Sequence, residues 1–349
     1  MFKLLFRIVL ACVVVGAAAA AIGGLAWTRI HEPYKGFAGE EQFIEIPAGS
    51  GSAEIRRRLV DGGVVRDEMA LRTALWLSGA ARRLKAGEYR FDRALTPLEV
   101  VDKLERGEVY LRRITFREGL TLREMAAVFA EREFGTAAAF LAAAANPSAI
   151  AELDPQARDL EGYLFPDTYD LPRTATAAAI VQVMVDRFKA AYDARARALA
   201  AEQGLSTREV VTLASLVEKE TGQADERPLV AAVYRNRMRI GMPMQADPTV
   251  VYALMKAGKY TGNIRRQDLS LDSPYNTYRY PGLPPGPIAA PGKASIDAAL
   301  APAAVKYLYF VSRNNGSHVF AETLAQHHAN VYEHQVLYFR KQRAESGRR

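Results

Sequence analysis

The 349-residue sequence contains one cysteine and five histidines. The lone cysteine, Cys12, excludes an internal disulfide framework and any zinc site built from cysteines. The histidines form no HExxH pattern, so metal catalysis has no support in the sequence. We therefore expect no metal-dependent catalysis.

The sequence also lacks a dominant basic block, although its net charge is +7 and its pI is about 9.4. Its arginine runs are scattered, at 56–58, 82–83, 112–113 and 265–266. A basic surface favours polyanions, but scattered charges are typical of solvated faces. This distribution argues against nucleic acid as a partner. Anionic lipids and anionic wall polymers remain candidates.

One long stretch carries no charge: residues 8–27 read IVLACVVVGAAAAAIGGLAW. As a helix, about 20 residues cross roughly 30 Å of membrane hydrocarbon. Lys3 and Arg7 precede the stretch, so the positive-inside rule puts the N-terminus in the cytoplasm and the remaining chain outside. A cleaved signal peptide is the second interpretation. The apolar run continues beyond its Ala-rich part, which favours an uncleaved anchor.

Strand-like and helix-like segments alternate after this stretch, which predicts an α+β fold. Strand-like runs at 43–46 and 87–91 accompany helix starts near Ser52 and Thr96, a pattern that looks like a small LysM-type glycan-binding module. The expected divisions are an anchor at 1–30, a polar linker at 31–42, the LysM-like module at 43–110, a second small α+β module or connector at 111–175, and a main domain at 176–345.

Two glutamates, Glu218 and Glu220, lie in the last turn of a helix predicted over 209–221, which stops at Gly222. Carboxylates at a helix C-terminus oppose the helix dipole, so their placement is locally unfavourable and hints at another purpose. They are separated by about 200° around the helix, so only one can face a cleft. The helical wheel does not decide which one.

The next sixty or so residues are rich in Pro, Gly, Tyr, Asn and Thr. Rigid loops of this kind suit sugar recognition, because rings stack on aromatics and hydroxyls pair with amides. Bracing of loops over a core is the alternative interpretation. The residues that we expect to line a sugar cleft are Gln245, Asp247, Thr249, Tyr275, Asn276, Thr277 and Tyr278. Asp247 precedes a proline, so it could equally begin a turn. His318 follows a predicted strand and is either a hairpin residue or a substrate contact.

Several long motifs resemble those of the YceG-like endolytic murein transglycosylases: LEGYLFPDTY, ASLVEKET, ERPLVAAVYRNRMRIGMPMQADPTVVYAL, SPYNTYRYPGLPPGPIAAPG and KYLYFVSR. Together with the N-terminal stretch and the block KAGEYRF, they follow the family's order over nearly the whole chain. The resemblance implies a lysozyme-like, mixed α+β catalytic domain. It also implies cleavage of MurNAc-β-1,4-GlcNAc bonds within peptidoglycan strands, which leaves 1,6-anhydro ends.

Such a reaction needs one carboxyl group with a raised pKa and no metal or other cofactor, whereas hydrolases typically use two carboxylates. The resemblance assigns this role to Glu220, which Thr221 follows as Ser follows Glu in related enzymes. Glu218 and His318 become supporting residues. The resemblance also implies a single-pass protein of the inner membrane that works with cell-wall synthases and limits strand length. A hydrolytic muramidase that uses Asp247, or a wall-binding scaffold without activity, remains the alternative.

Overall fold

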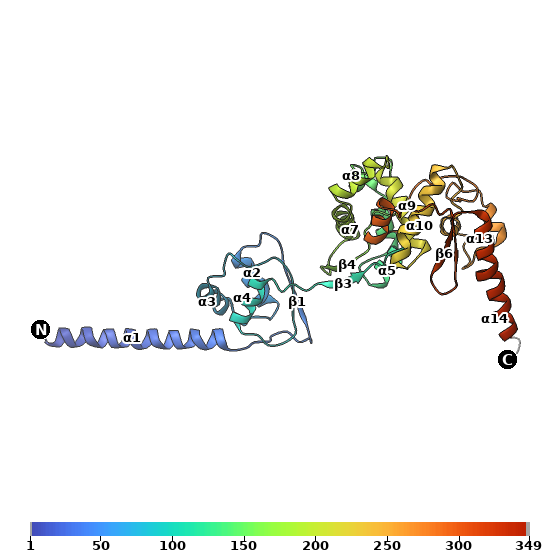
Figure 1. The fold of residues 1–349 in the computed structure, drawn as a ribbon. Coiled ribbons are helices and arrows are strands. Elements are labelled where there is room, and N and C mark those ends of the chain that lie inside the picture. The colour runs from blue at the N-terminus through green and yellow to red at the C-terminus, as the bar shows by residue number, and fades with distance from the viewer. Residues whose placement is uncertain (1, 347–349) are drawn as a thin grey trace. The chain divides into compact units, whose positions relative to one another are not determined.

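The computed structural model describes residues 2–346 and has a mixed α+β fold. The chain divides into two compact units (Figure 1). The smaller unit contains the chain up to Arg113 together with Asp170–Thr174, and the larger unit contains Ile114–Tyr169 and everything from Ala175 onward. The separate module expected at 111–175 is therefore mostly part of the larger unit. Helices α5 (Leu122–Glu131) and α6 (Ala137–Ala144) pack on each other there, and α6 also packs on α7 (Ala177–Ala191).

Helix α1 (Phe2–His31) is the expected apolar helix, and its segment Val9–His31 is long and apolar enough to cross a membrane. Its last turn belongs to the smaller unit, because Ile30 is buried in that unit's core. The linker expected at 31–42 also packs against this unit. Tyr34 pairs with Leu95 as an isolated antiparallel bridge, which satisfies backbone groups that a free linker would leave to water.

The smaller unit is a two-stranded antiparallel sheet covered by helices. Strands β1 (Gln42–Ile46) and β2 (Gly87–Phe91) pair in the register Ile44↔Tyr89. Alternate residues of both strands face the core, as the strand period requires. The helices are α2 (Ser52–Asp61), α3 (Glu68–Ser78) and α4 (Pro97–Arg106). Helix α4 starts with Thr96 and Glu99 in a capping box, and this start is well predicted by the sequence.

Strands β3 (Arg112–Thr115) and β4 (Thr168–Leu171) form a second two-stranded sheet. The segment Asp170–Thr174, which begins within β4, belongs to the smaller unit, where the Arg173 guanidinium donates to the buried Glu88 carboxylate at 2.5 Å. The Arg173 guanidinium also lies over the Phe43 ring, 4.6 Å from its centre. This ion pair attaches a segment that is distant in sequence to the rest of the smaller unit.

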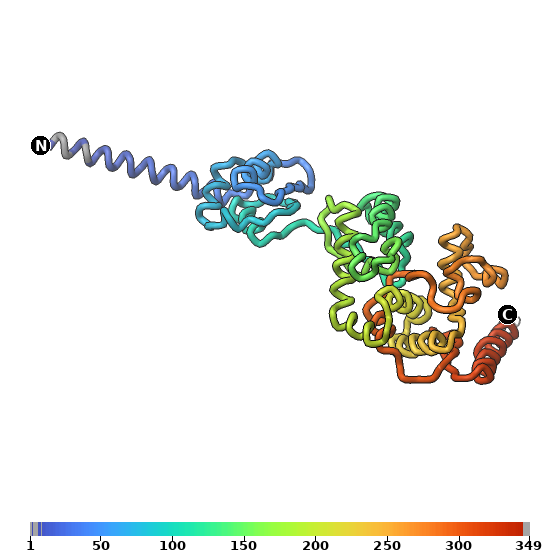
Figure 2. Tube along the Cα trace, turned by 90° about the horizontal axis from the view of Figure 1, so that it is seen from above, coloured from blue at the N-terminus to red at the C-terminus, as the bar shows by residue number. Residues whose placement is uncertain are grey.

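The larger unit is mainly helical, as Figures 1 and 2 show. Helix α9 (Thr207–Glu220) is its central element: Val210–Val217 are all buried, and α9 packs against helices α8, α10, α11 and α12. The other α-helices are α8 (Ala194–Glu202), α10 (Arg227–Arg239), α11 (Asp247–Lys256), α12 (Lys293–Leu300), α13 (Leu324–Val331) and α14 (Tyr338–Ser346). Strands β5 (Tyr309–Ser312) and β6 (His318–Ala321) form a hairpin. Four short segments complete the unit: the 3-10 turns Pro147–Ile150, Ala224–Glu226 and Arg266–Ser270 and the π-helical Tyr332–Leu337.

Candidate active site

Glu220 is the last residue of α9, and Thr221 continues in an extended conformation. The Glu220 side chain is half-buried, and Oε1 accepts a hydrogen bond of 2.7 Å from the Tyr234 hydroxyl of α10. Burial raises the pKa of Glu220 to about 7, against the opposing effect of the Tyr234 hydrogen bond, and the charge of Asp247 raises it further. A carboxyl group in this setting is present in large part as the acid near neutral pH, which is what proton donation requires.

Arg237 lies three residues after Tyr234 on α10, and its guanidinium is buried. It donates to three backbone carbonyls: those of Leu308 at 2.6 Å, Met244 at 2.6 Å and Pro243 at 3.2 Å. Burial lowers the pKa of Arg237. One side chain thus ties the loop before α11 and the residue before β5 to the helix that carries Tyr234.

Asp247 begins α11 and is exposed. The Tyr278 hydroxyl donates to Asp247 Oδ1 at 2.6 Å. Burial, together with this hydrogen bond and the Asp247 charge, raises the pKa of Tyr278. The charge of Glu220 also raises it, so Glu220, Asp247 and Tyr278 form one electrostatic group. The structure therefore brings together three of the residues that the sequence nominated.

Glu218 points to a different partner. Its Oε2 accepts hydrogen bonds from the backbone N–H of Gly292 at 3.0 Å and from the Ser295 hydroxyl at 2.7 Å. Gly292 is the N-cap of α12, where a carboxylate is stabilised by the free N–H groups and by the helix dipole. Glu218 and Glu220 thus have different partners, and Glu220 stays the candidate acid.

Three of the expected cleft residues are buried instead of lining a cleft: Thr249, Asn276 and Thr277. The Thr249 and Thr277 hydroxyls are 2.9 Å apart, and the Thr249 hydroxyl donates to the Ala246 carbonyl. The Asn276 amide donates to the carbonyls of Leu269 and Leu271. Buried polar groups need such partners. These three side chains are thus bonded to protein partners within the unit, whereas Gln245, Asp247 and Tyr278 keep exposed surface.

Gln245 precedes this group and has a left-handed backbone conformation, with φ of 50°. Few residues other than glycine adopt this region, and those that do cluster at functional sites. Its side chain is exposed, and its backbone N–H donates to the Thr277 carbonyl at 3.3 Å. Gln245 therefore keeps its place as a candidate substrate contact.

His318 is the first residue of β6 and is hydrogen-bonded to Glu226. Its backbone N–H and its Nδ1 lie 2.7 Å from the two oxygens of Glu226. Glu226 Oε2 also accepts from the Thr221 hydroxyl at 3.0 Å. Burial opposes ionisation of Glu226, but the hydrogen bonds from His318 and Thr221 lower its pKa overall. The β5–β6 hairpin is thereby joined to the residue that follows Glu220.

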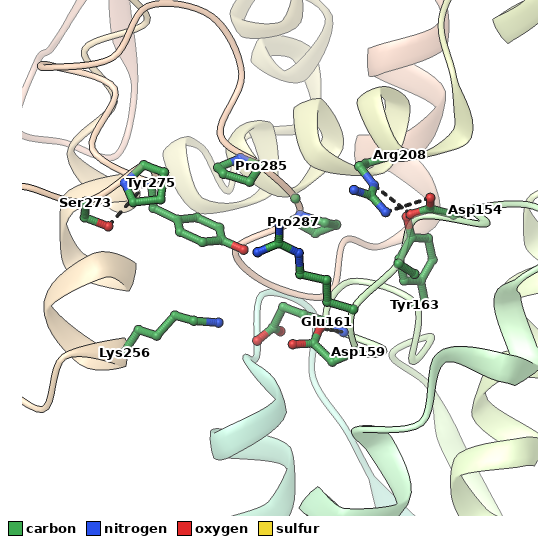
Figure 3. A pocket seen from close by; sticks show the side chains of 14 residues that line it. Asp154, Asp159, Glu161, Tyr163, Arg208, Lys256, Ser273, Tyr275, Pro285 and Pro287 are labelled. Carbon is green, nitrogen blue, oxygen red and sulfur yellow. Dashed lines mark hydrogen bonds and ion pairs between the residues drawn. The ribbon is translucent and has the colours of Figure 1, made fainter.

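Tyr275 lines a separate cavity of about 280 Å³, which Glu220 does not line (Figure 3). The Tyr275 ring contacts that of Tyr252, with centres 4.9 Å apart, and Lys256 lies over both rings. Glu161 is buried at this cavity and accepts from the Leu122 N–H at 3.0 Å and the Tyr252 hydroxyl at 3.1 Å. Burial raises the pKa of Glu161 to about 8. Glu161 thus joins the start of α5 to α11.

The sequence matches the YceG-like family over residues 44–333. The chain belongs to this family. An endolytic murein transglycosylase of Bacillus subtilis (strain 168) is 34% identical over 300 residues, which are 81% of this chain and 82% of that protein. A protein of the same name from Streptococcus pneumoniae serotype 2 is 30% identical and aligns with 83% of this chain and 58% of its own length. The crystal structure of a yceG-like protein from Listeria monocytogenes superposes on this chain with a TM-score of 0.57 and 31% sequence identity. The superposition covers 84% of this chain and 99% of that one.

Three residues around the candidate acid of this YceG-like chain were not predicted from the sequence: Tyr234, Arg237 and Glu226. Tyr234 lies in the apolar stripe of α10, where an aromatic residue is most often part of the core. Arg237 is one of four arginines in α10, and nothing local marks it as the buried one. Glu226 precedes a helix with proline in its first turn, which is an ordinary helix start.

Replacing Tyr234 by phenylalanine is expected to shift the pH dependence of this family's reaction in this chain. The Tyr234 hydroxyl lowers the pKa of Glu220, so its loss raises that pKa. The protonated acid then persists to higher pH, and the fall of kcat/KM on the alkaline side moves upward. A pH–rate profile measures this shift. The exposed Tyr260 supplies the control, because Tyr260→Phe should leave the profile unchanged; a downward shift in Tyr234→Phe would contradict the assignment.

Proposed function

We propose that this chain is an endolytic murein transglycosylase, which cleaves MurNAc-β-1,4-GlcNAc bonds within peptidoglycan strands and leaves 1,6-anhydro-MurNAc ends. The observation that carries the proposal is the half-buried Glu220, which is held by Tyr234 and has its pKa raised to about 7. Membership of the YceG-like family and relatives that bear this name support it.

In the proposed reaction, protonated Glu220 donates its proton to the glycosidic oxygen as the bond from C1 of MurNAc to that oxygen breaks. The C6 hydroxyl of the same MurNAc attacks C1 and forms the 1,6-anhydro ring. The Glu220 carboxylate takes up the C6 hydroxyl proton, which restores the acid for the next turnover. No water is consumed, and one carboxyl group serves both steps.

Asp247 has a second role in this proposal. Positive charge develops on the sugar ring at the transition state, and a nearby carboxylate stabilises it electrostatically. The Tyr278 hydrogen bond orients the Asp247 carboxylate. Gln245 and Tyr278 are proposed as direct sugar contacts, because both retain exposed surface beside Asp247. Tyr275 would contact a more distant part of the strand, since it lines the separate cavity.

We also propose that α1 anchors the protein in the inner membrane as a single pass, with the N-terminus in the cytoplasm and both units outside. The length and composition of Val9–His31 support this arrangement. The smaller unit would act as a LysM-like glycan-binding module and the larger one as a lysozyme-like catalytic domain. Tethering would confine cleavage to strands near the membrane, where cell-wall synthases work, and would limit strand length.

Mass spectrometry of products tests the proposed function directly. Purified protein should convert uncrosslinked glycan strands to shorter strands with 1,6-anhydro ends, which weigh one water less than reducing ends. Reducing ends would instead identify a hydrolytic muramidase, with Asp247 as the second carboxylate. Strand binding without any cleavage would favour a wall-binding scaffold.

A further inference from the structure

Helix α3 exposes three large apolar side chains in a unit that otherwise has a well-packed core. Met69 is 71% exposed, Trp76 79% and Leu77 52%. The opposite face of the helix is buried through Ala70, Leu71, Ala74 and Leu75. Single exposed apolar residues are ordinary, but a cluster that includes an almost fully exposed tryptophan marks an interaction surface.

The spacing of Met69 and Trp76 puts them on one face of α3, with Leu77 beside it. Met69 and Trp76 are seven residues apart, which is about two helical turns, and Leu77 is adjacent to Trp76. Arg72 lies between them and is exposed, and Arg82 follows the helix and is also exposed. Neither arginine forms an ion pair with any other residue between 2 and 346. We call Met69, Arg72, Trp76, Leu77 and Arg82 the α3 surface.

The α3 surface belongs to the same unit as the end of α1, so the position of one relative to the other is defined. Asp67, the N-cap of α3, accepts a hydrogen bond of 2.8 Å from Arg29 in the last turn of α1. Ile30 is buried in the shared core, and α1 packs against both α3 and α4. Figure 1 shows α3 on the side of the unit from which α1 extends. The two helices are therefore held together where α1 enters the unit.

This position is the level of the lipid head groups if α1 spans a membrane. From Val9, about 20 helical residues cross roughly 30 Å of hydrocarbon, so the helix leaves the hydrocarbon near Trp27 to Arg29. Asp67 contacts Arg29 at that level. Tryptophan is enriched in this interfacial region, and arginine side chains there attract anionic lipids.

We propose that the α3 surface rests in the head-group region of the membrane that α1 spans, with Trp76 and Met69 in the interface and Arg72 and Arg82 at anionic lipid head groups. The inference relies on the proposed anchoring by α1. Its consequence is that the smaller unit makes two contacts with the membrane, α1 and α3, instead of pivoting about the end of one helix. A bilayer is favoured over a protein partner because α1 brings the bilayer to this surface.

The two tryptophans of the chain allow a direct test. In the full-length Trp27→Phe protein, reconstituted in vesicles of phosphatidylcholine and phosphatidylglycerol, Trp76 is the only tryptophan. We expect its emission maximum to lie at shorter wavelength than that of an exposed tryptophan. We also expect its emission to lose intensity when the lipid chains are brominated near the head group. Replacing Arg72 and Arg82 by glutamine should reduce this loss in vesicles that contain phosphatidylglycerol.

The matched Trp76→Phe protein leaves Trp27 as the reporter of the anchor itself. Quenching of Trp27 with a solvent-like, unquenched Trp76 would overturn the inference and leave the anchor intact. Absence of quenching at both positions would refute the anchor and the inference together. A short-wavelength emission of Trp76 that brominated lipid does not quench would mean that protein covers the surface, and dependence on protein density would identify a second copy of the chain.

Discussion

Glu220→Gln is expected to lower kcat for strand cleavage by about 10²- to 10⁴-fold, because an amide cannot supply the proton that the leaving oxygen needs. The substitution keeps the size of the side chain and an oxygen that can accept the Tyr234 hydrogen bond. It also removes a carboxyl group whose ionisation is opposed by burial. The folded-state pKa of Glu220 is raised from 4.5 to about 7, so ionisation of this group lowers the free energy of unfolding as the pH rises between these two values. The loss remains in full at higher pH. The variant should therefore be no less stable than wild type at pH 8.

Glu218→Gln is the matched control on the same helix turn. Glutamine retains one acceptor for Gly292 or Ser295 but loses the negative charge at the start of α12. We expect a modest loss of stability, about 1 kcal/mol, and cleavage at a rate close to that of wild type. Rates of anhydro-product formation and urea unfolding curves measure both effects. An inactive Glu218→Gln protein with an active Glu220→Gln protein would reverse the assignment.

Arg237→Ala is expected to destabilise the larger unit by about 3–5 kcal/mol, since it leaves the buried Met244 carbonyl and two part-buried carbonyls without this donor. The guanidinium is the donor to the Leu308, Met244 and Pro243 carbonyls, and it also lies over the Tyr309 ring at 5.4 Å. The loss should appear as a lower midpoint of urea unfolding for the larger unit.

Arg239, two residues further along α10, provides the comparison for Arg237. It is exposed, and its hydrogen bond to the Asn236 side chain is long, at 3.4 Å. Arg239→Ala should change the free energy of unfolding by less than about 0.5 kcal/mol, as is usual at the surface. Equal effects of the two substitutions would show that the carbonyl contacts of Arg237 contribute little.

Local sequence signals predicted much of the fold. The alternation of Ile44 and Ile46 identified a strand, and Thr96 with Pro97 and Glu99 identified a helix start, because these patterns act within a few residues. The apolar part of α1 was evident because residues 8–27 carry no charge. The domain limits were less predictable. Ile30 joins a core built from residues up to Leu104, and no local pattern records that contact.

The candidate site was only partly predictable for the same reason. The sequence placed two glutamates at the end of α9, but only the long-range bonds of Glu218 to residues 292 and 295 and of Glu220 to Tyr234 distinguish them in space. The polar loop residues divide in a similar way. Thr249 and Thr277 pair inside the unit and Asp247 stays outside, although all three occur in the same polar, Pro- and Gly-rich stretch of sequence.

The β5–β6 hairpin lies far along the chain from the acid, yet His318 binds the same carboxylate as Thr221, and Leu308 accepts from Arg237. Synthesis proceeds from the N-terminus, so α1 leaves the ribosome first and this hairpin among the last elements. Under the proposed topology, the chain would be tethered to its membrane before the surroundings of Glu220 are complete. The order of synthesis itself would then keep a wall-cutting site unfinished until the protein is in place.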